Sequence, residues 1–148
     1  MADPLTEQDP RVAQVCAFWE TLSPSNLASL RTVYSEAAEF RDPFNALHGA
    51  DQLEALLTRM FERLLSPRFV VLDVVSQNDA AVLVWDFHYR LRGWQPQRER
   101  HIHGASHVCF GADGRVVVHR DYWDAAGEVY EQLPVLGPLL RWLKRRVG

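Results

Sequence analysis

The sequence predicts an α+β fold in which helices come first and a curved antiparallel (mixed) sheet follows. Apolar residues recur at helical spacing in the first half of the chain, whereas the second half has four runs of alternating apolar and polar residues. Short turns separate these runs, which favours antiparallel pairing of consecutive strands. The 148 residues are expected to form a single domain, with a core at 8–123 and a C-terminal helical extension at 124–148.

Three N-terminal helices are expected, each from a start signal followed by apolar residues. Asp9 is a predicted N-cap with proline at the first helical position after it. Ser23 and the proline after it repeat this signal before a second short helix. After Gly49, seven apolar residues within 53–65 form one continuous stripe. Ser66 and its following proline are expected to end this third helix.

One short strand among the helices, at 37–41, and four long strands after them are expected. The long strands are predicted from β-branched residues, alternation and turn signals at 69–77, 80–92, 98–111 and 115–123. A last helical region is expected from about Ala125, interrupted by prolines, and continues over 139–146.

Strand alternation predicts which side chains share the inner face of the sheet. These inward residues are Leu83, Trp85, Phe87 and Tyr89 of the strand at 80–92, Ile102, Gly104, Ser106, Val108 and Phe110 of the next, and Val117, His119, Asp121 and Trp123 of the last. An aromatic-rich face beneath an amphipathic helix can enclose a pocket, or its rings can simply fill a core. The pattern alone leaves both alternatives open.

The opposite face of the sheet is predicted to carry titratable side chains. They are Asp86, His88 and Arg90 on one strand and His101, His103 and His107 on the next. Two histidines two apart on a strand can share a metal ion, but no cysteine or carboxylate spacing completes a known site. We therefore expect no metal and no cofactor, and interpret this face as solvated or intersubunit.

Composition narrows the partners and the compartment. A net charge of −3 does not favour nucleic acid, and neither a signal peptide nor an apolar membrane-spanning stretch is visible, which predicts a cytoplasmic protein. Two cysteines suggest no disulfide framework. The C-terminal segment is amphipathic and basic; it could touch a membrane surface, but we expect Leu136, Leu139, Leu140 and Leu143 to cover the pocket or a strand.

Two segments carry a family resemblance: YSEAAEFRDPFNALHG at 34–49 and FGADGRVVVHRDYWD at 110–124. Over about 12–123 the chain resembles the nuclear transport factor 2-like superfamily, in its SnoaL-like and ketosteroid isomerase-like branch. The resemblance implies a cone-shaped sheet around an apolar pocket, and a homodimer that pairs through the outer sheet face. It implies no single reaction, because the superfamily includes isomerases, polyketide cyclases, dehydratases and binding modules.

The resemblance also places two known active sites on this sequence. Asp42 corresponds to the general-base aspartate of ketosteroid isomerase, whereas Phe18 and Ser106 stand where that enzyme has its oxyanion-hole tyrosine and aspartic acid. A phenyl ring cannot donate a hydrogen bond, so steroid isomerisation by that route is not expected. Asp121 resembles the aspartate of limonene-1,2-epoxide hydrolase, but Asp86 lacks the arginine two residues before it that completes that triad.

Asp42, His119 and Asp121 are therefore the predicted catalytic residues. His119 and Asp121 lie two apart on one strand, and a carboxylate beside an imidazole can hold its tautomer and raise its basicity. Burial in an apolar cone is expected to raise the pKa of a carboxyl group toward neutral pH. The structural alternatives are a turn residue before Pro43 and a satisfied polar pair. The predicted substrate-binding residues are Phe18, Trp19, Tyr34, Phe44, Met60, Leu83, Trp85, Phe87, Ser106, Val108 and Trp123.

Two functions follow from this pattern. The first is a small cofactor-free enzyme of the isomerase, cyclase or dehydratase type, with acid–base chemistry on an apolar carbonyl compound. The alternative is a non-catalytic module that binds a hydrophobic small molecule or serves as an accessory dimer.

Overall fold

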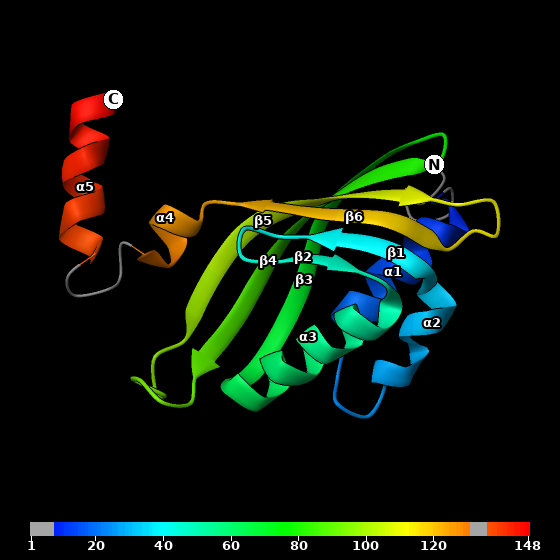
Figure 1. Ribbon diagram of the computed structural model, residues 1–148, viewed down its shortest axis with the longest axis horizontal. Coiled ribbons are helices and arrows are strands. Elements are labelled where there is room, and N and C mark those ends of the chain that lie inside the picture. The colour runs from blue at the N-terminus through cyan, green and yellow to red at the C-terminus, as the bar shows by residue number, and fades with distance from the viewer. Residues whose placement is uncertain (1–7, 131–135) are drawn as a thin grey trace, which may run out of the picture.

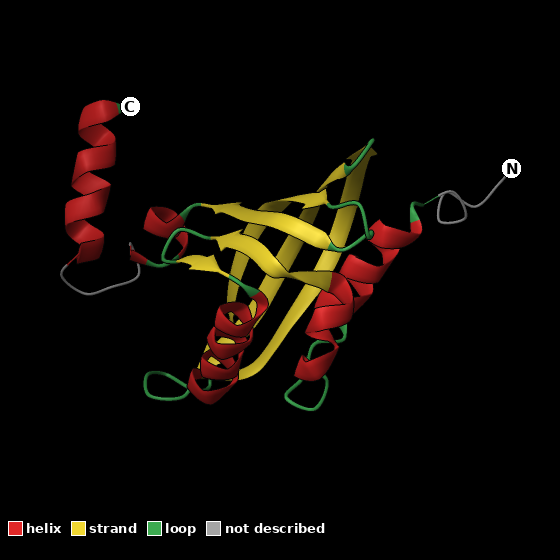
Figure 2. Cartoon of the chain, turned by 45° about the vertical axis from the view of Figure 1, so that its right-hand side comes forward, coloured by secondary structure: helices red, strands yellow, loops and turns green. Residues whose placement is uncertain are grey.

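The computed structural model describes residues 8–130 and 136–148, and its centre is an unclosed six-stranded sheet that curves around helices on one side (Figures 1 and 2). The strands are β1 (Tyr34–Arg41), β2 (Ala46–His48), β3 (Leu64–Gln77), β4 (Ala80–Leu91), β5 (Arg100–Phe110) and β6 (Val116–Trp123). The helices are α1 (Pro10–Glu20), a 3-10 turn η1 (Leu27–Ser29), α2 (Leu30–Val33), α3 (Ala50–Arg63), α4 (Ala125–Glu128) and α5 (Leu136–Val147). The predicted α+β fold is confirmed.

The sheet is mixed, in the order β2-β1-β6-β5-β4-β3. Consecutive strands from β3 to β6 pair antiparallel, as their short turns predict. β1 joins this meander by parallel pairing with β6, which places the segment after β1 beside the end of β6. Strand β2, which no sequence signal predicted, pairs antiparallel with β1.

The boundary between α3 and β3 differs from the prediction. Helix α3 ends at Arg63, and β3 begins at Leu64, so Ser66 and Pro67 lie inside the strand. Pairing with β4 shifts register between Leu65 and Arg68, and Ser66 has φ of 51°. The proline is therefore accommodated in a β-bulge, one of the few strand positions that tolerate a residue without an N–H. The expected helix stop is in fact a bend in a long strand.

A second bulge changes one predicted face. The pairing of β5 with β6 shifts register between Cys109 and Phe110, next to Val116. As a result Val116 is fully buried and Val117 is not, the reverse of the prediction. His119 is buried beyond the bulge, and Asp121 and Trp123 are half-buried on its face, as the alternation predicts.

Helices α1 and α3 supply the apolar side chains that cover the inner face of the sheet (Figure 2). Val12 and Val15 of α1 and Leu53 and Leu57 of α3 are at most 3% exposed. They belong to the same core cluster as inward residues of β4, β5 and β6, so the predicted inner face forms one side of the core.

The C-terminal helix does not cover the core as expected. In α5, Leu139 is 52% and Leu143 is 42% exposed, and Figure 1 shows the helix standing away from the sheet. Arg141, Lys144 and Arg145 share this exposed helix, which makes it both apolar and basic. Among the described residues no helix combines the length and apolar character needed to cross a membrane.

The two cysteines are expected to react at very different rates in the native protein. Burial, and to a lesser degree the charge of Glu20, raises the pKa of the Cys16 thiol to about 11, so about 0.1% of it is thiolate at pH 8. Cys109 lies half-buried on the outer face. Iodoacetamide at pH 8 should therefore label Cys109 and leave Cys16 unmodified, as measured by peptide mass spectrometry. Equal labelling of both thiols would contradict the described burial of α1.

Candidate functional site

The sheet and helices enclose a cavity of about 310 Å³ whose wall is almost entirely apolar. A volume of this size lies within the range of small-molecule sites. Its lining residues are Trp19, Phe40, Asp42, Phe44, Leu56, Leu57, Met60, Leu64, Phe69, Trp85, Phe87, Tyr89, Ile102, Asp121, Trp123 and Val129. Only two of them, Asp42 and Asp121, carry carboxyl groups.

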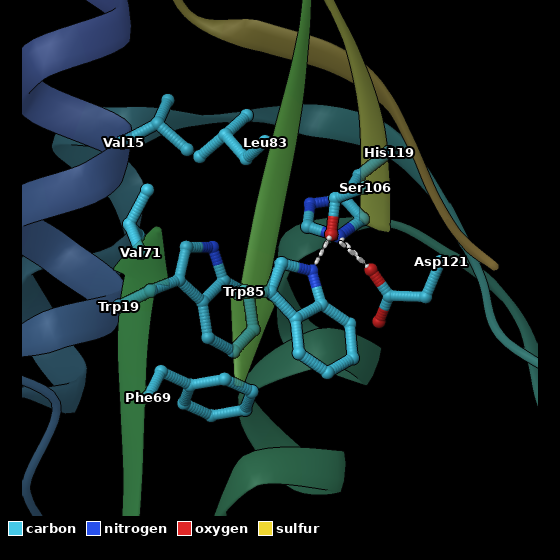
Figure 3. Close-up of a pocket in the computed structure, with 9 residues that line it drawn as sticks. All are labelled: Val15, Trp19, Phe69, Val71, Leu83, Trp85, Ser106, His119 and Asp121. Atoms are coloured by element: carbon cyan, nitrogen blue, oxygen red, sulfur yellow. Dashed lines mark hydrogen bonds and ion pairs between the residues drawn. The ribbon is translucent and has the colours of Figure 1, made fainter. Parts of the chain in front are cut away.

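Asp121 is held at this cavity by two hydrogen bonds to the same oxygen. His119 Nε2 lies 2.6 Å from Asp121 Oδ1, and the Ser106 hydroxyl donates to the same oxygen at 2.5 Å. Figure 3 shows the Ser106 hydroxyl between the Trp85 indole and the Asp121 carboxyl group, whose Oδ2 points away from both. The side chain of Asp121 is 16% exposed, whereas that of His119 is 3% exposed. One carboxylate oxygen is therefore fixed, and within the described part of the chain no hydrogen bond is seen to the other.

A chain of buried hydrogen bonds leads from α1 to His119. Trp19 Nε1 donates to the Tyr34 hydroxyl at 2.8 Å, and that hydroxyl lies 2.7 Å from His119 Nδ1. Burial raises the pKa of the Tyr34 phenol well above its usual value, so Tyr34 keeps its proton. Because an indole N–H only donates, the Tyr34 oxygen accepts from Trp19, and the Tyr34 proton is available to His119 Nδ1. The other ring nitrogen, Nε2, faces Asp121 Oδ1.

A second chain fixes Ser106 in the same way. Trp85 Nε1 donates to Ser106 Oγ at 2.8 Å, which directs the serine proton to Asp121. The two chains converge on one oxygen of Asp121 and draw their residues from α1 and from four strands, β1, β4, β5 and β6. A space of about 20 Å³ lies beside them, between Val15, Leu83 and His119 (Figure 3). That space is large enough for one water molecule.

Gly104 lets the Trp85 indole lie across β5. Gly104 pairs with Trp85 on β4 and with Trp123 on β6, and a Cβ at this glycine would be 2.7 Å from Trp85 Cη2. A contact below 3 Å would force the Trp85 ring to move. Because Trp85 is only 6% exposed and closely packed, that movement would disturb its neighbours. The small residue is thus a requirement of the hydrogen bond between Trp85 and Ser106.

The substitution Gly104→Ala is expected to destabilise the protein by about 1–3 kcal/mol through overpacking and to shift the tryptophan fluorescence. Gly93→Ala is the matched control, since a Cβ there has nothing within 4 Å, and its effect should stay within about 0.5 kcal/mol. Urea unfolding of both variants measures the difference. Equal stability of the two would show that Trp85 is not confined as described.

Asp42 also lines the cavity, but its carboxyl group organises a turn. Its Oδ1 accepts the backbone N–H groups of Phe44 and Asn45, both at 2.7 Å, and the Asn45 side chain contacts both carboxyl oxygens at 3.0 Å. This is the Asx-turn geometry that an aspartate before a proline favours. The turn leads into β2 and carries Phe44 to the cavity, where its ring contacts Trp123.

A sequence model of the SnoaL-like domain matches residues 15–119, about 70% of the chain. The chain belongs to this family. The match includes the second half of α1, the Asp42 turn, Ser106 and His119, and it ends two residues before Asp121. A comparison with curated protein sequences found no match.

Solved structures with the same fold come from several bacteria. A Catenulispora acidiphila protein with a ketosteroid isomerase-like fold, in complex with trimethylamine, is 13% identical with TM-score 0.70, over 84% of this chain and 92% of that chain. A proposed SnoaL-like polyketide cyclase from Shewanella putrefaciens is 17% identical with TM-score 0.69, over 85% and 100%. An M. tuberculosis LEH-like epoxide hydrolase is 17% identical with TM-score 0.67, over 93% and 94%. At such identities the likeness shows the fold alone.

Within this family member, most of the predicted binding residues surround the two spaces. Trp19, Phe44, Met60, Trp85, Phe87 and Trp123 line the large cavity, and Leu83 and Ser106 line the small space. Phe18, Tyr34 and Val108 lie elsewhere, in the apolar core, and line neither of these two spaces. Tyr34 reaches the site through His119 instead. Asp86 lies on the outer face, as predicted, so it cannot join Asp121 in an epoxide hydrolase triad.

Sequence reasoning missed several lining residues, including Phe69, Leu64 and Ile102. Phe69 of β3 points inward, where its ring contacts Trp19, Trp85 and Phe87. The bulge at Ser66 shifts the alternation of β3, so the sequence alone did not indicate which face of the sheet Phe69 occupies. Ile102 was correctly assigned to the inner face, but alternation does not indicate which inward residues of a strand border the cavity.

Proposed function

We propose that the protein is a cofactor-free acid–base enzyme that moves a proton on an apolar ring ketone or related carbonyl compound. The observation that carries the proposal is Asp121, a carboxylate with one fixed oxygen at the wall of an apolar cavity of about 310 Å³. Such a cavity excludes water from the carboxylate and offers the substrate an apolar surface.

In this proposal Asp121 is the general base. Its Oδ2 removes a proton from the carbon next to the carbonyl group, which leaves Asp121 as a carboxylic acid and the substrate as an enolate. The carboxylic acid then returns that proton to another carbon of the enolate, which restores the Asp121 carboxylate. His119 and Ser106 are positioning residues, because they hold Oδ1 and leave Oδ2 free. Asp42, occupied by its turn, shapes the cavity entrance and takes no proton.

Negative charge that develops on the substrate oxygen needs a donor inside the cavity. Tyr89 lines the cavity and is 8% exposed. Burial raises the pKa of its phenol, so the phenol remains protonated and can donate. Tyr89 lies six residues along β4 from Leu83, which shares a row with Ser106 and Asp121, so we assign it to a polar group at the end of the substrate away from Asp121.

The test is exchange of carbon-bound protons for deuterium, because exchange reports proton abstraction whatever the final product is. The wild-type protein is incubated in D₂O with a panel of substituted cyclic ketones, and the exchange is followed by proton NMR. We expect catalysed exchange that saturates with at least one ketone and is lost in Asp121→Asn. No catalysed exchange with any ketone, or exchange that survives this substitution, would end the assignment.

A second candidate function is binding without catalysis, and one observation favours it. The Ser106 hydroxyl, which stands at the acid position of the ketosteroid isomerase oxyanion hole, donates to Asp121 instead of facing the cavity. Trp19, Trp85 and Trp123 all line the cavity, so their fluorescence should respond to an apolar ligand. Saturable quenching together with no deuterium exchange would favour the binding module.

Two further properties remain proposals. A homodimer would form through the outer face of the sheet, where Val82, Val118 and Tyr122 are exposed. The protein would act in the cytoplasm, and Cys16 and Cys109 are both free thiols. Sedimentation of the purified chain measures the first of these.

A further inference from the structure

Four metal-ligating side chains form a square on the outer face of the sheet, away from the cavity. Asp86 and His88 lie two apart on β4, and β5 places His103 opposite Asp86 and His101 opposite His88. Strands β4 and β5 are direct neighbours in the sheet (Figure 1). The pairing of these residues therefore places all four side chains within one small area. The side chains are 23–56% exposed, which leaves the square open to solvent.

The distances within the square are close to those of a metal site. Ligand atoms of Asp86, His88 and His101 all lie within 4.8 Å of one another. Asp86 Oδ1 is 2.9 Å from His101 Nε2 and 2.7 Å from His103 Nδ1. A tetrahedral zinc ion with bonds of about 2.0–2.2 Å holds its ligands about 3.3–3.6 Å apart. Asp86, His88 and His101 therefore form a group of three within about 1 Å of that spacing, and His103 joins it through its contact with Asp86.

A neighbouring carboxylate supports one of the histidines. Glu99 Oε1 lies 3.2 Å from His88 Nδ1 and 3.3 Å from Arg68. A metal-bound histidine commonly donates its other ring N–H to a carboxylate, which fixes the ring and its tautomer. With Nδ1 held by Glu99, Nε2 is the nitrogen of His88 that is left for a metal.

We propose that Asp86, His88, His101 and His103 form a surface site for a divalent transition metal of the zinc class. Imidazole nitrogen with one carboxylate oxygen suits zinc, copper or nickel, and it does not suit the all-oxygen preference of magnesium or calcium. Asp86 and His88 come from β4 and the other two histidines from β5, so the site depends on the pairing of the two strands. The site needs no cavity residue and is independent of the proposed acid–base function.

The experiment is zinc binding by the untagged full chain, measured by competition with a chromophoric chelator. We expect one zinc ion per chain in the wild type and at least tenfold weaker binding in Asp86→Asn and in the double variant with His88→Gln and His101→Gln. His48→Gln is the matched control, because His48 is an exposed histidine on β2, and it should bind like the wild type. Magnesium should not compete.

The nearby pair of Cys109 and His107, 3.8 Å apart, is the competing zinc site on the same face. Cobalt distinguishes the two, because a thiolate ligand adds a sulfur-to-cobalt charge-transfer band that nitrogen and oxygen ligands do not give. The proposal expects no such band, and unchanged zinc affinity in Cys109→Ser. Loss of zinc in Cys109→Ser, full retention in the double variant, or no zinc bound by the wild type at micromolar concentration would each overturn it.

Discussion

Asp121→Asn is expected to lower the rate of catalysed deuterium exchange by about 10²–10⁴-fold, the usual contribution of a positioned general base. Asparagine has nearly the same shape and keeps an oxygen for the hydrogen bonds from His119 and Ser106. The substitution therefore removes the basic oxygen at the cavity and leaves the two donor chains in place. Circular dichroism and urea unfolding should show a folded protein, so the loss is one of chemistry.

Asp42→Asn is the matched control for this prediction, since Asp42 is the other carboxyl group on the cavity wall. Asparagine favours the same turn and can accept the same backbone N–H groups of Phe44 and Asn45. Its exchange rate should stay within a few-fold of the wild type. A large loss in Asp42→Asn with an active Asp121→Asn would reverse the two roles and restore the base position that the family resemblance implies.

Tyr34→Phe is expected to lower the free energy of unfolding by about 2–6 kcal/mol. The Tyr34 ring is fully buried, and phenylalanine fills nearly the same volume, so packing changes little. The loss comes from two buried partners: Trp19 Nε1 no longer has an acceptor, and His119 Nδ1 no longer has a donor. Each unsatisfied buried group costs about 1–3 kcal/mol.

Tyr122→Phe is the control for the hydroxyl itself, because Tyr122 is 52% exposed on the outer face and stacks under Arg120. Its stability should change by no more than about 0.5 kcal/mol in urea unfolding followed by circular dichroism. If Tyr34→Phe is as stable as Tyr122→Phe, the hydrogen-bond chain from Trp19 to Asp121 does not carry the energy assigned to it.

Local patterns predicted the elements well where one rule governed a whole segment. The apolar stripe within 53–65 correctly predicted helix α3, which ends at Arg63. Alternation correctly placed Trp85, Ser106 and Asp121 on one face of the sheet. The pattern failed at irregularities. Pro67 is a strong local stop signal, but its bulge depends on pairing with β4, which a single segment does not encode.

The contacts that define the site were not predictable from spacing alone. Tyr34 and His119 are 85 residues apart, and Trp85 and Ser106 are 21 apart, so their hydrogen bonds depend on the register of the sheet. The pairing of His119 with Asp121 was predicted, because two residues on one strand point the same way. Asp86 and the histidines were assigned to the correct face. Their closeness to one another could not be predicted without knowing how β4 and β5 pair.

A crystal structure of the protein with a bound cyclic ketone from the exchange panel tests the central claim most directly. We expect the ring in the cavity between Phe69 and Met60, with the carbon next to the carbonyl group about 3–3.5 Å from Asp121 Oδ2. A ketone bound elsewhere, or bound with Asp42 as its nearest carboxylate, would contradict the role that we assign to Asp121.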